Sequence, residues 1–214
     1  MRDIYHEELD SIGATLIEMT GLVGSAMERA TTALLDVDLQ VAESVIAADD
    51  AIDALQQRLD TRALDLLARQ QPVAGDLRTI MTSLRMSADL ERMGDLARHV
   101  AKVARRRYPE PAVPAELRDS IQDMGRIAVE LAAKTATIIE GRDVDIAREL
   151  PVDDDAMDQL HRKLFSTLLD PAAPYSVEAA IDVTLIGRYY ERFADHAVSV
   201  AKRVVFLVTG EHGD

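Results

Sequence analysis

This 214-residue sequence contains no cysteine and no tryptophan, and aromatic residues make up only 4% of it. Without cysteine there are no disulfide bonds, thiolate metal sites or cysteine nucleophiles, so a bound metal would need oxygen or imidazole ligands. The scarcity of aromatic rings leaves little material for stacking on nucleic acid bases. No apolar run approaches the ~20 residues of a membrane-spanning helix, and no glycine-rich phosphate loop is present.

Positive charge is also scarce, because 24 lysines and arginines face 38 aspartates and glutamates, which gives a formal net charge of −14. The field of such a protein repels nucleic acid phosphates and anionic lipids. We therefore do not expect binding to DNA. Hydrophobic residues make up 48% of the chain, which is enough for a well-buried core.

The hydrophobic residues follow the period of an α-helix. Steps of three and four residues connect apolar positions from Leu9 to Ala33, and apolar residues recur every seven positions from Val45 to Leu66. A third segment, 77–100, carries two apolar stripes, which predicts neighbours on two sides. Since no segment shows the alternation of a strand, the sequence predicts an all-α fold.

The second half of the chain repeats the first. Residues 108–114 contain three prolines and cannot continue a helix. Beyond them the pattern restarts, with Leu16 matching Ile121 at an offset of 105, and seven of the 13 residues at 91–103 are identical to those 100 positions later. We expect six long helices in two tandem three-helix bundles, 1–107 and 115–214, joined by the linker 108–114. Pro151 is expected to kink or delay the fifth helix.

Carboxylates four residues apart occur in the second and third helix of each repeat, a spacing that places both on one helix face. Ionised carboxylates at such seam positions are costly unless they are paired or bind metal. Four oxygen ligands would suit magnesium, manganese or iron, with zinc as a further option. The sequence therefore predicts two metal sites, one from Asp49, Asp53, Glu91 and Asp95 and one from Asp154, Asp158, Glu191 and Asp195.

Arginines offer an alternative explanation for these acids, because ion pairs would also compensate their charge. The candidates are Arg58, Arg62, Arg92, Arg98, Arg188 and Arg192. Arg105-Arg106-Arg107 either forms a docking patch or places favourable cations at a helix C-terminus.

Histidines do not support a diiron oxidase, whose Glu-x-x-His pairs would be expected on two helices. Only Asp158 is followed by a histidine at the third position, His161. That histidine is either a fifth ligand of the second site, or a group at the surface or just behind the ligands. His99 and His196 are expected to be structural or solvated.

Three segments of the sequence belong together: Gln71-Pro72-Val73-Ala74-Gly75-Asp76-Leu77-Arg78, Asp89-Leu90-Glu91-Arg92-Met93-Gly94-Asp95 and the second Glu191-Arg192-Phe193-Ala194-Asp195. In these segments the chain resembles the PhoU family. The resemblance covers nearly the whole chain. It implies a cytoplasmic negative regulator of phosphate uptake that acts with the ATPase subunit of a phosphate ABC transporter and a sensor histidine kinase. It also implies iron or other metal clusters on the Glu/Asp-x-x-x-Asp pairs. Tyr189 replaces the acid found at Asp89, which favours the first metal site over the second.

Three classes of function follow from these observations. The first is a noncatalytic signalling adaptor that silences the phosphate-starvation response, which rests mainly on the resemblance. The second is a carboxylate-bridged metalloenzyme, and the third is a passive helical scaffold. Because no catalytic constellation is recognisable, we expect that the protein is not an enzyme. Helices with two apolar stripes also predict a homodimer through exposed helix faces.

Overall fold

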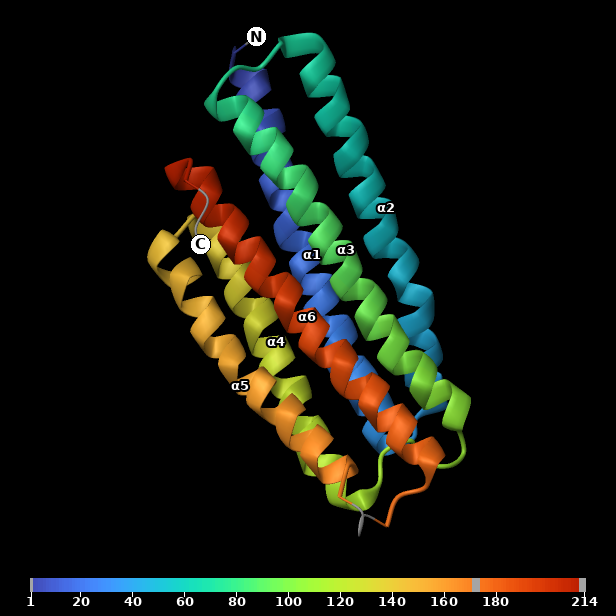
Figure 1. The fold of residues 1–214 in the computed structure, drawn as a ribbon. Coiled ribbons are helices and arrows are strands. Elements are labelled where there is room, and N and C mark those ends of the chain that lie inside the picture. The colour runs from blue at the N-terminus through green and yellow to red at the C-terminus, as the bar shows by residue number, and fades with distance from the viewer. Residues whose placement is uncertain (1, 171–173, 212–214) are drawn as a thin grey trace.

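The computed structural model describes residues 2–170 and 174–211 (Figure 1). Within these ranges it contains six α-helices and one short 3-10 helix, and no strand. None of these helices is long and apolar enough to cross a membrane. The elements are α1 (Arg2–Asp36), α2 (Leu39–Gln70), α3 (Gly75–Arg107), η1 (Ala115–Leu117), α4 (Arg118–Gly141), α5 (Val144–Leu168) and α6 (Val177–Thr209). The prediction of an all-α tandem repeat is confirmed.

Side-chain caps determine where several helices begin. Asp38 caps α2 by accepting a hydrogen bond from the Val41 amide at 3.0 Å, and Asp143 caps α5 in the same way. The expected delay of the fifth helix at Pro151 is wrong, because α5 begins seven positions earlier, at Val144. The Asp143 cap and the burial of Leu150 in the core stabilise the turns that precede the proline.

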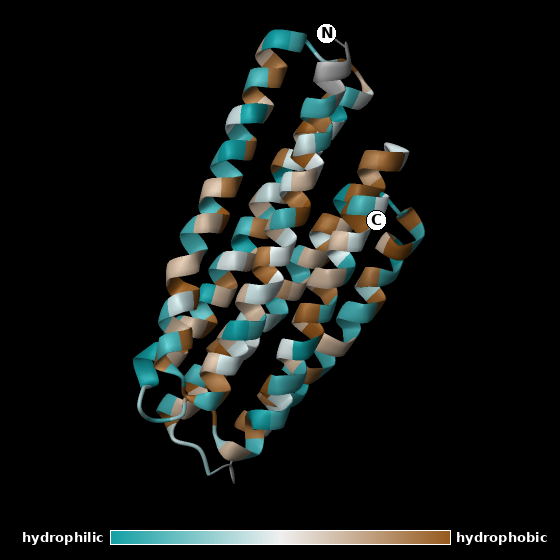
Figure 2. Cartoon of the chain, turned by 180° about the vertical axis from the view of Figure 1, so that it is seen from behind, coloured by the Kyte–Doolittle hydropathy of each residue, from teal (hydrophilic) through white to brown (hydrophobic). Residues whose placement is uncertain are grey.

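The helices form two three-helix bundles that lie side by side. α2 contacts α1 and α3, whereas α5 contacts α4 and α6. The four remaining helices, α1, α3, α4 and α6, form the centre of the molecule, and α2 and α5 cover its two flanks (Figure 1). Both hydrophobic and hydrophilic residues occur along the length of the helices (Figure 2), as expected of amphipathic helices. The matched residues Leu16 and Ile121 are both buried in this core.

The two repeats meet in reciprocal contacts between α3 and α6. Asp89 of α3 accepts a hydrogen bond of 2.6 Å from Nε of Arg203 in α6, and its other oxygen lies 3.1 Å from Nδ1 of His196. Tyr189 of α6, the counterpart of Asp89, lies against the ring of His99 in α3, with 5.2 Å between ring centroids. Such reciprocal contacts are the signature of a twofold relation. The repeats are therefore related by an approximate internal twofold axis.

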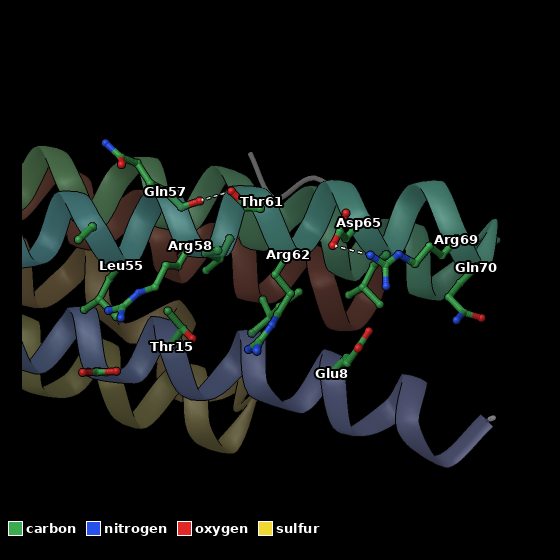
Figure 3. A pocket seen from close by; sticks show the side chains of 15 residues that line it. Glu8, Thr15, Leu55, Gln57, Arg58, Thr61, Arg62, Asp65, Arg69 and Gln70 are labelled. Carbon is green, nitrogen blue, oxygen red and sulfur yellow. Dashed lines mark hydrogen bonds and ion pairs between the residues drawn. The ribbon is translucent and has the colours of Figure 1, made fainter.

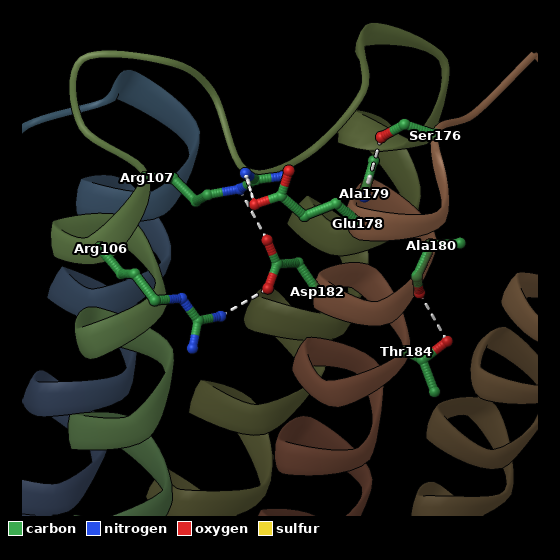
Figure 4. Close-up of polar contacts among 8 residues, drawn as sticks. All are labelled: Arg106, Arg107, Ser176, Glu178, Ala179, Ala180, Asp182 and Thr184. Atoms are coloured by element: carbon green, nitrogen blue, oxygen red, sulfur yellow. Dashed lines mark hydrogen bonds and ion pairs between the residues drawn. The ribbon is translucent and has the colours of Figure 1, made fainter.

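The ends of α3 and α6 are also held together, in antiparallel orientation. Arg106 and Arg107 at the end of α3 form ion pairs with the buried Asp182 near the start of α6, at 2.5 and 2.7 Å (Figure 4). At the other end, the guanidinium of Arg78 lies 6.0 Å from the ring centroid of Phe206. The arginine run at 105–107 thus contributes to the junction between the repeats.

A further junction joins α1, α4 and α6. The hydroxyl groups of Thr31 and Tyr190 are hydrogen bonded at 2.7 Å in the buried core. Gly125 of α4 faces the same threonine so closely that a Cβ atom there would lie 2.6 Å from Thr31 Cγ2. Glycine at this position permits the close approach of α1 and α4.

Candidate metal centre

The first acid cluster forms where α2 and α3 approach closely. A Cβ atom on Gly94 would lie 2.9 Å from Ile52 Cδ1 and 3.2 Å from Asp49 Oδ1, so a larger residue there would push the helices apart. This approach brings Asp49 and Asp53 of α2 into electrostatic contact with the third-helix acids. The four predicted residues therefore share one seam: Asp49, Asp53, Glu91 and Asp95.

Arginines neutralise part of this first cluster. Arg98 lies 2.6 Å from Asp49 Oδ2 and also donates a hydrogen bond to Asp95 Oδ1. Arg92 donates to the other oxygen of Asp95 at 2.7 Å. The ion-pair explanation is confirmed for Arg92 and Arg98 in this cluster.

Burial and mutual repulsion nevertheless act on the acids of the first cluster. Burial raises the pKa of Asp49 above its ordinary value; Arg98 opposes this rise, while Asp53 and Asp95 add to it. Burial, followed by the charge of Asp95, likewise raises the pKa of Glu91. Asp49 Oδ2 is buried, and the ion pair with Arg98 compensates its charge.

The second cluster occupies the equivalent seam between α5 and α6. Here the close approach is at Gly187, where a Cβ atom would lie 2.7 Å from Leu164 Cδ2 and 3.3 Å from the ring of His161. The four predicted residues again influence one another electrostatically: Asp154, Asp158, Glu191 and Asp195.

The second cluster has fewer cations than the first. Arg188 pairs with Glu191, and Arg162 lies 3.9 Å from Asp158 in an exposed position. Within the described part of the chain, Asp154 and Asp195 form no ion pair. Burial, then repulsion by the three other acids, raises the pKa of Asp154 to about 7. A cation is the partner that this cluster lacks.

His161 lies beside the second cluster. Burial, followed by the charge of Asp195, raises the pKa of the neighbouring Glu191, and Arg188 opposes this rise. Nε2 of His161 is buried and has no hydrogen-bond partner among the described residues. Of its two expected roles, a further ligand fits this orphaned nitrogen better than a surface group.

The residues fit a metal ion at the second cluster better than at the first. As they are placed, no group of three or more His, Asp or Glu side chains in the described residues is arranged to hold an ion, so binding would require rotation of these side chains. At the first cluster such rotation would also break the pairs with Arg92 and Arg98. At the second cluster Asp154 and Asp195 have no cation to displace.

A family model described as the PhoU domain matches the chain twice, over residues 16–104 and 121–204. The chain belongs to the PhoU family. "Phosphate-specific transport system accessory protein PhoU homolog 2" of Mycobacterium tuberculosis is 51% identical over 210 residues, which cover 98% of this chain and 99% of the relative. "PhoU homolog 1" of Mycobacterium leprae is also 51% identical, covering 98% and 95%.

Solved PhoU structures share the fold. PhoU from Pseudomonas aeruginosa is 29% identical with a TM-score of 0.87, and the match covers 97% of this chain and 100% of that one. The phosphate transport system regulatory protein PhoU from Streptococcus pneumoniae is 26% identical with a TM-score of 0.89, covering 98% and 99%. The tandem arrangement described above is thus the PhoU arrangement.

The placement of Asp89 changes the comparison between the two PhoU repeats. This residue lies in the α3–α6 interface with Arg203 and His196. Burial alone would raise its pKa, but hydrogen bonds from His196 and Arg203 outweigh burial and lower the pKa. Since Asp89 is a member of the interface and not of the acid cluster, Tyr189 in its place gives no reason to favour the first cluster.

Two of the arginines proposed as partners of the acids lie elsewhere in this PhoU chain. Arg58 and Arg62 extend from α2 toward α1 in a groove of about 1120 Å³ between these helices (Figure 3). Arg62 donates a hydrogen bond of 2.6 Å to Ser11. Arg192 forms no ion pair with the acids in the described ranges. The ion-pair explanation is therefore wrong for Arg58, Arg62 and Arg192.

Proposed function

We propose that this chain is a regulatory accessory protein of a phosphate-specific transport system, which restrains phosphate uptake and the phosphate-starvation response. The observation that carries the proposal is the match of 51% identity over 98% of the chain to a protein named for that role. The match includes both repeats, and the Streptococcus pneumoniae structure with the same fold is described as a transport system regulator.

In this proposal the chain acts in the cytoplasm as an adaptor. Its partners are the ATPase subunit of the phosphate ABC transporter and a sensor histidine kinase. Long amphipathic helices with exposed apolar residues, among them Met81 and Ile181, suit contacts with proteins better than the binding of a small substrate. The adaptor therefore needs no catalytic residues of its own, and self-association into a homodimer stays a separate prediction.

The proposal includes metal binding on the two acid clusters, with the second cluster as the stronger site. Asp154, Asp158, Glu191 and Asp195 would supply oxygen ligands for manganese, magnesium, iron or zinc. The bound cation would offset the burial and the repulsion by neighbouring acids that together raise the pKa of Asp154 to about 7. Metal would thus stabilise the α5–α6 seam.

A carboxylate-bridged metalloenzyme is the second candidate function, because the same acids could hold a reactive metal. Purified protein loaded with iron or manganese decides between the two candidates. Turnover of oxygen or of phosphate esters above the rate of free metal, lost in Asp154→Asn, would favour the enzyme. A passive scaffold would show neither turnover nor binding to the transporter ATPase.

Deletion in the native host tests the regulatory function. We expect expression of phosphate-starvation genes to rise in phosphate-rich medium, and a copy of the gene to restore repression. Deletion of any paralogue in the same strain is the necessary control. Unchanged expression in the strain that lacks all copies would contradict the proposed function.

A further inference from the structure

Each repeat exposes a small apolar patch on the seam between its second and third helices. We define the first patch as Leu64, Leu77 and Met81 and the second patch as Leu169, Val177 and Ile181, all six of which are exposed. These residues correspond through the internal repeat, since Leu64 matches Leu169 at an offset of 105 and Met81 matches Ile181 at an offset of 100. Scattered surface hydrophobics would not follow the repeat.

The register of the helix pairs places each patch next to its acid cluster. Asp53 of α2 and Glu91 of α3 lie opposite one another. Counting the same number of residues from each of them toward the loop between α2 and α3 places Leu64 level with the segment between Leu77 and Met81. The 11 residues from Asp53 to Leu64 are close to three helical turns, which keeps both on one face and about 15 Å apart. The 11 residues from Asp158 to Leu169 repeat this spacing.

The two patches lie at opposite ends of the antiparallel pair of α3 and α6. Arg78 lies beside Phe206, and Arg107 pairs with Asp182. The patches are therefore separated by most of the length of α3, about 40 Å at 1.5 Å per residue. Because an approximate twofold axis relates the two patches, a partner that itself has twofold symmetry can contact both patches in the same way.

Charge indicates what covers the patches. Each patch has an acid cluster beside it, and the chain carries a net charge of −14. A second copy that docked patch to patch would bring these acid clusters together, which like-charge repulsion opposes. A basic partner would instead be attracted to them. A partner that matches this surface has an apolar side chain for the patch and a basic side chain about 15 Å away from it for the acid cluster. It carries two such pairs of side chains, one for each repeat.

We propose that the two patches form one bivalent docking surface for a homodimeric protein. Each partner subunit inserts an apolar anchor into one patch and places basic side chains beside the neighbouring acid cluster in its metal-free state. Two linked contacts bind far more tightly than either alone, because the second contact forms within the complex. The choice of proteins for the test rests on the proposed function.

The experiment measures binding of the intact chain to two purified proteins, the ATPase subunit of the phosphate transporter and the cytoplasmic part of the sensor kinase. Met81→Lys disrupts the first patch and Ile181→Lys the second. We expect each variant to weaken binding about 100-fold, and the double variant to show no measurable binding. Leu22→Lys, at an exposed apolar residue of α1 outside both patches, is the matched control and should change affinity less than about twofold.

Stoichiometry and folding complete the test. Sedimentation should give one chain for two partner subunits, and Met81→Leu should bind like the wild type. Circular dichroism shows whether each variant is folded. The inference is overturned if only one patch matters, if two chains bind each partner dimer, or if Met81→Lys abolishes self-association of the chain. Failure of the wild type to bind either protein would instead contradict the proposed adaptor function, and the inference with it.

Discussion

Asp89 of α3 and Arg203 of α6 form an ion pair of 2.6 Å across the two repeats, although 114 positions separate them in the sequence. The carboxylate of Asp89 is buried, and His196 occupies its other oxygen. Tyr189, the counterpart of Asp89 about the internal twofold axis, instead lies against the ring of His99. The two corresponding residues thus make different contacts, one ionic and one between rings.

Replacement of Asp89 should weaken the association of the repeats. Asp89→Asn leaves the partly buried Arg203 without its counter-charge, so we expect the free energy of unfolding to fall by about 3 kcal/mol. Denaturant unfolding at neutral pH measures this loss. Asp65→Asn, which removes the exposed pair with Arg69, is the control and should cost less than about 1 kcal/mol. Equal effects of the two replacements would contradict the role assigned to Asp89.

The same interface predicts that the free energy of unfolding depends on pH. Hydrogen bonds from His196 and Arg203 lower the folded-state pKa of Asp89 below its value in the unfolded chain. Its stabilising contribution is therefore present above the unfolded pKa and is lost as pH falls through the folded pKa. We expect the difference in stability between wild type and Asp89→Asn to shrink below about pH 4. A difference that stays constant on acidification would show that the carboxylate charge is not the cause.

The second acid cluster predicts the opposite behaviour. The pKa of Asp154 is raised from 3.8 to about 7, so the folded state binds this proton more tightly than the unfolded chain does. The contribution to stability is full below pH 4 and is lost as pH rises through about 7. In chelator-treated protein, Asp154→Asn should therefore be more stable than wild type at pH 8, by about 1 kcal/mol after screening by solvent. Thermal melts across pH measure the difference, and a less stable variant at pH 8 would contradict repulsion among these acids.

Added metal should act mainly through the second cluster. Manganese, magnesium or ferrous iron should raise the melting temperature of chelator-treated wild type. At a hundredfold excess of metal over its dissociation constant, the free energy of unfolding should rise by about 2.7 kcal/mol. Asp154→Asn with Asp195→Asn should remove this response. Glu91→Gln with Asp95→Asn should instead destabilise the metal-free protein at pH 7, by about 2 kcal/mol, because Arg92 loses its partner and Arg98 keeps only Asp49 of its two. A wild type that no metal stabilises would exclude both metal sites.

The close contact between Thr31 and Gly125 predicts that alanine has opposite effects on stability at two glycine positions. Gly125→Ala would place a methyl group 2.6 Å from Thr31 Cγ2, so we expect a loss of about 2 kcal/mol. Gly21→Ala in α1 is the matched control, since nothing lies within 4 Å of its Cβ position. That change should stabilise the helix by up to about 1 kcal/mol. Similar effects at the two positions would show that α1 and α4 have room to separate.

The fold was predictable because its signals are local or repeated. Asp38 and Asp143 are N-cap residues placed before amphipathic segments, and each caps the helix that follows it. Repetition of the Glu91–Asp95 spacing at Glu191 and Asp195 revealed the tandem arrangement. Such signals depend on helix geometry alone and need no knowledge of how the helices assemble.

The roles of individual arginines and of Asp89 could not be predicted in this way. Arg58 and Arg98 look alike in the sequence, but Arg98 lies on the α2–α3 seam while Arg58 faces α1. The partner of Asp89 depends on the way in which the second repeat packs against the first, which no periodicity specifies. The charge difference between the two acid clusters has the same origin, because it depends on which side chains each seam encloses.

The ion pair of Asp89 in the α3–α6 interface has a consequence for the history of the chain. A single ancestral repeat could have assembled with a copy of itself through this surface. Two copies of the present first repeat could not do so in the same way, because Asp89 would face Leu96 and Val103 of the copy, the counterparts of His196 and Arg203. A buried carboxylate would then have no counter-charge. The two repeats have diverged into complementary halves, and each now depends on being joined to the other.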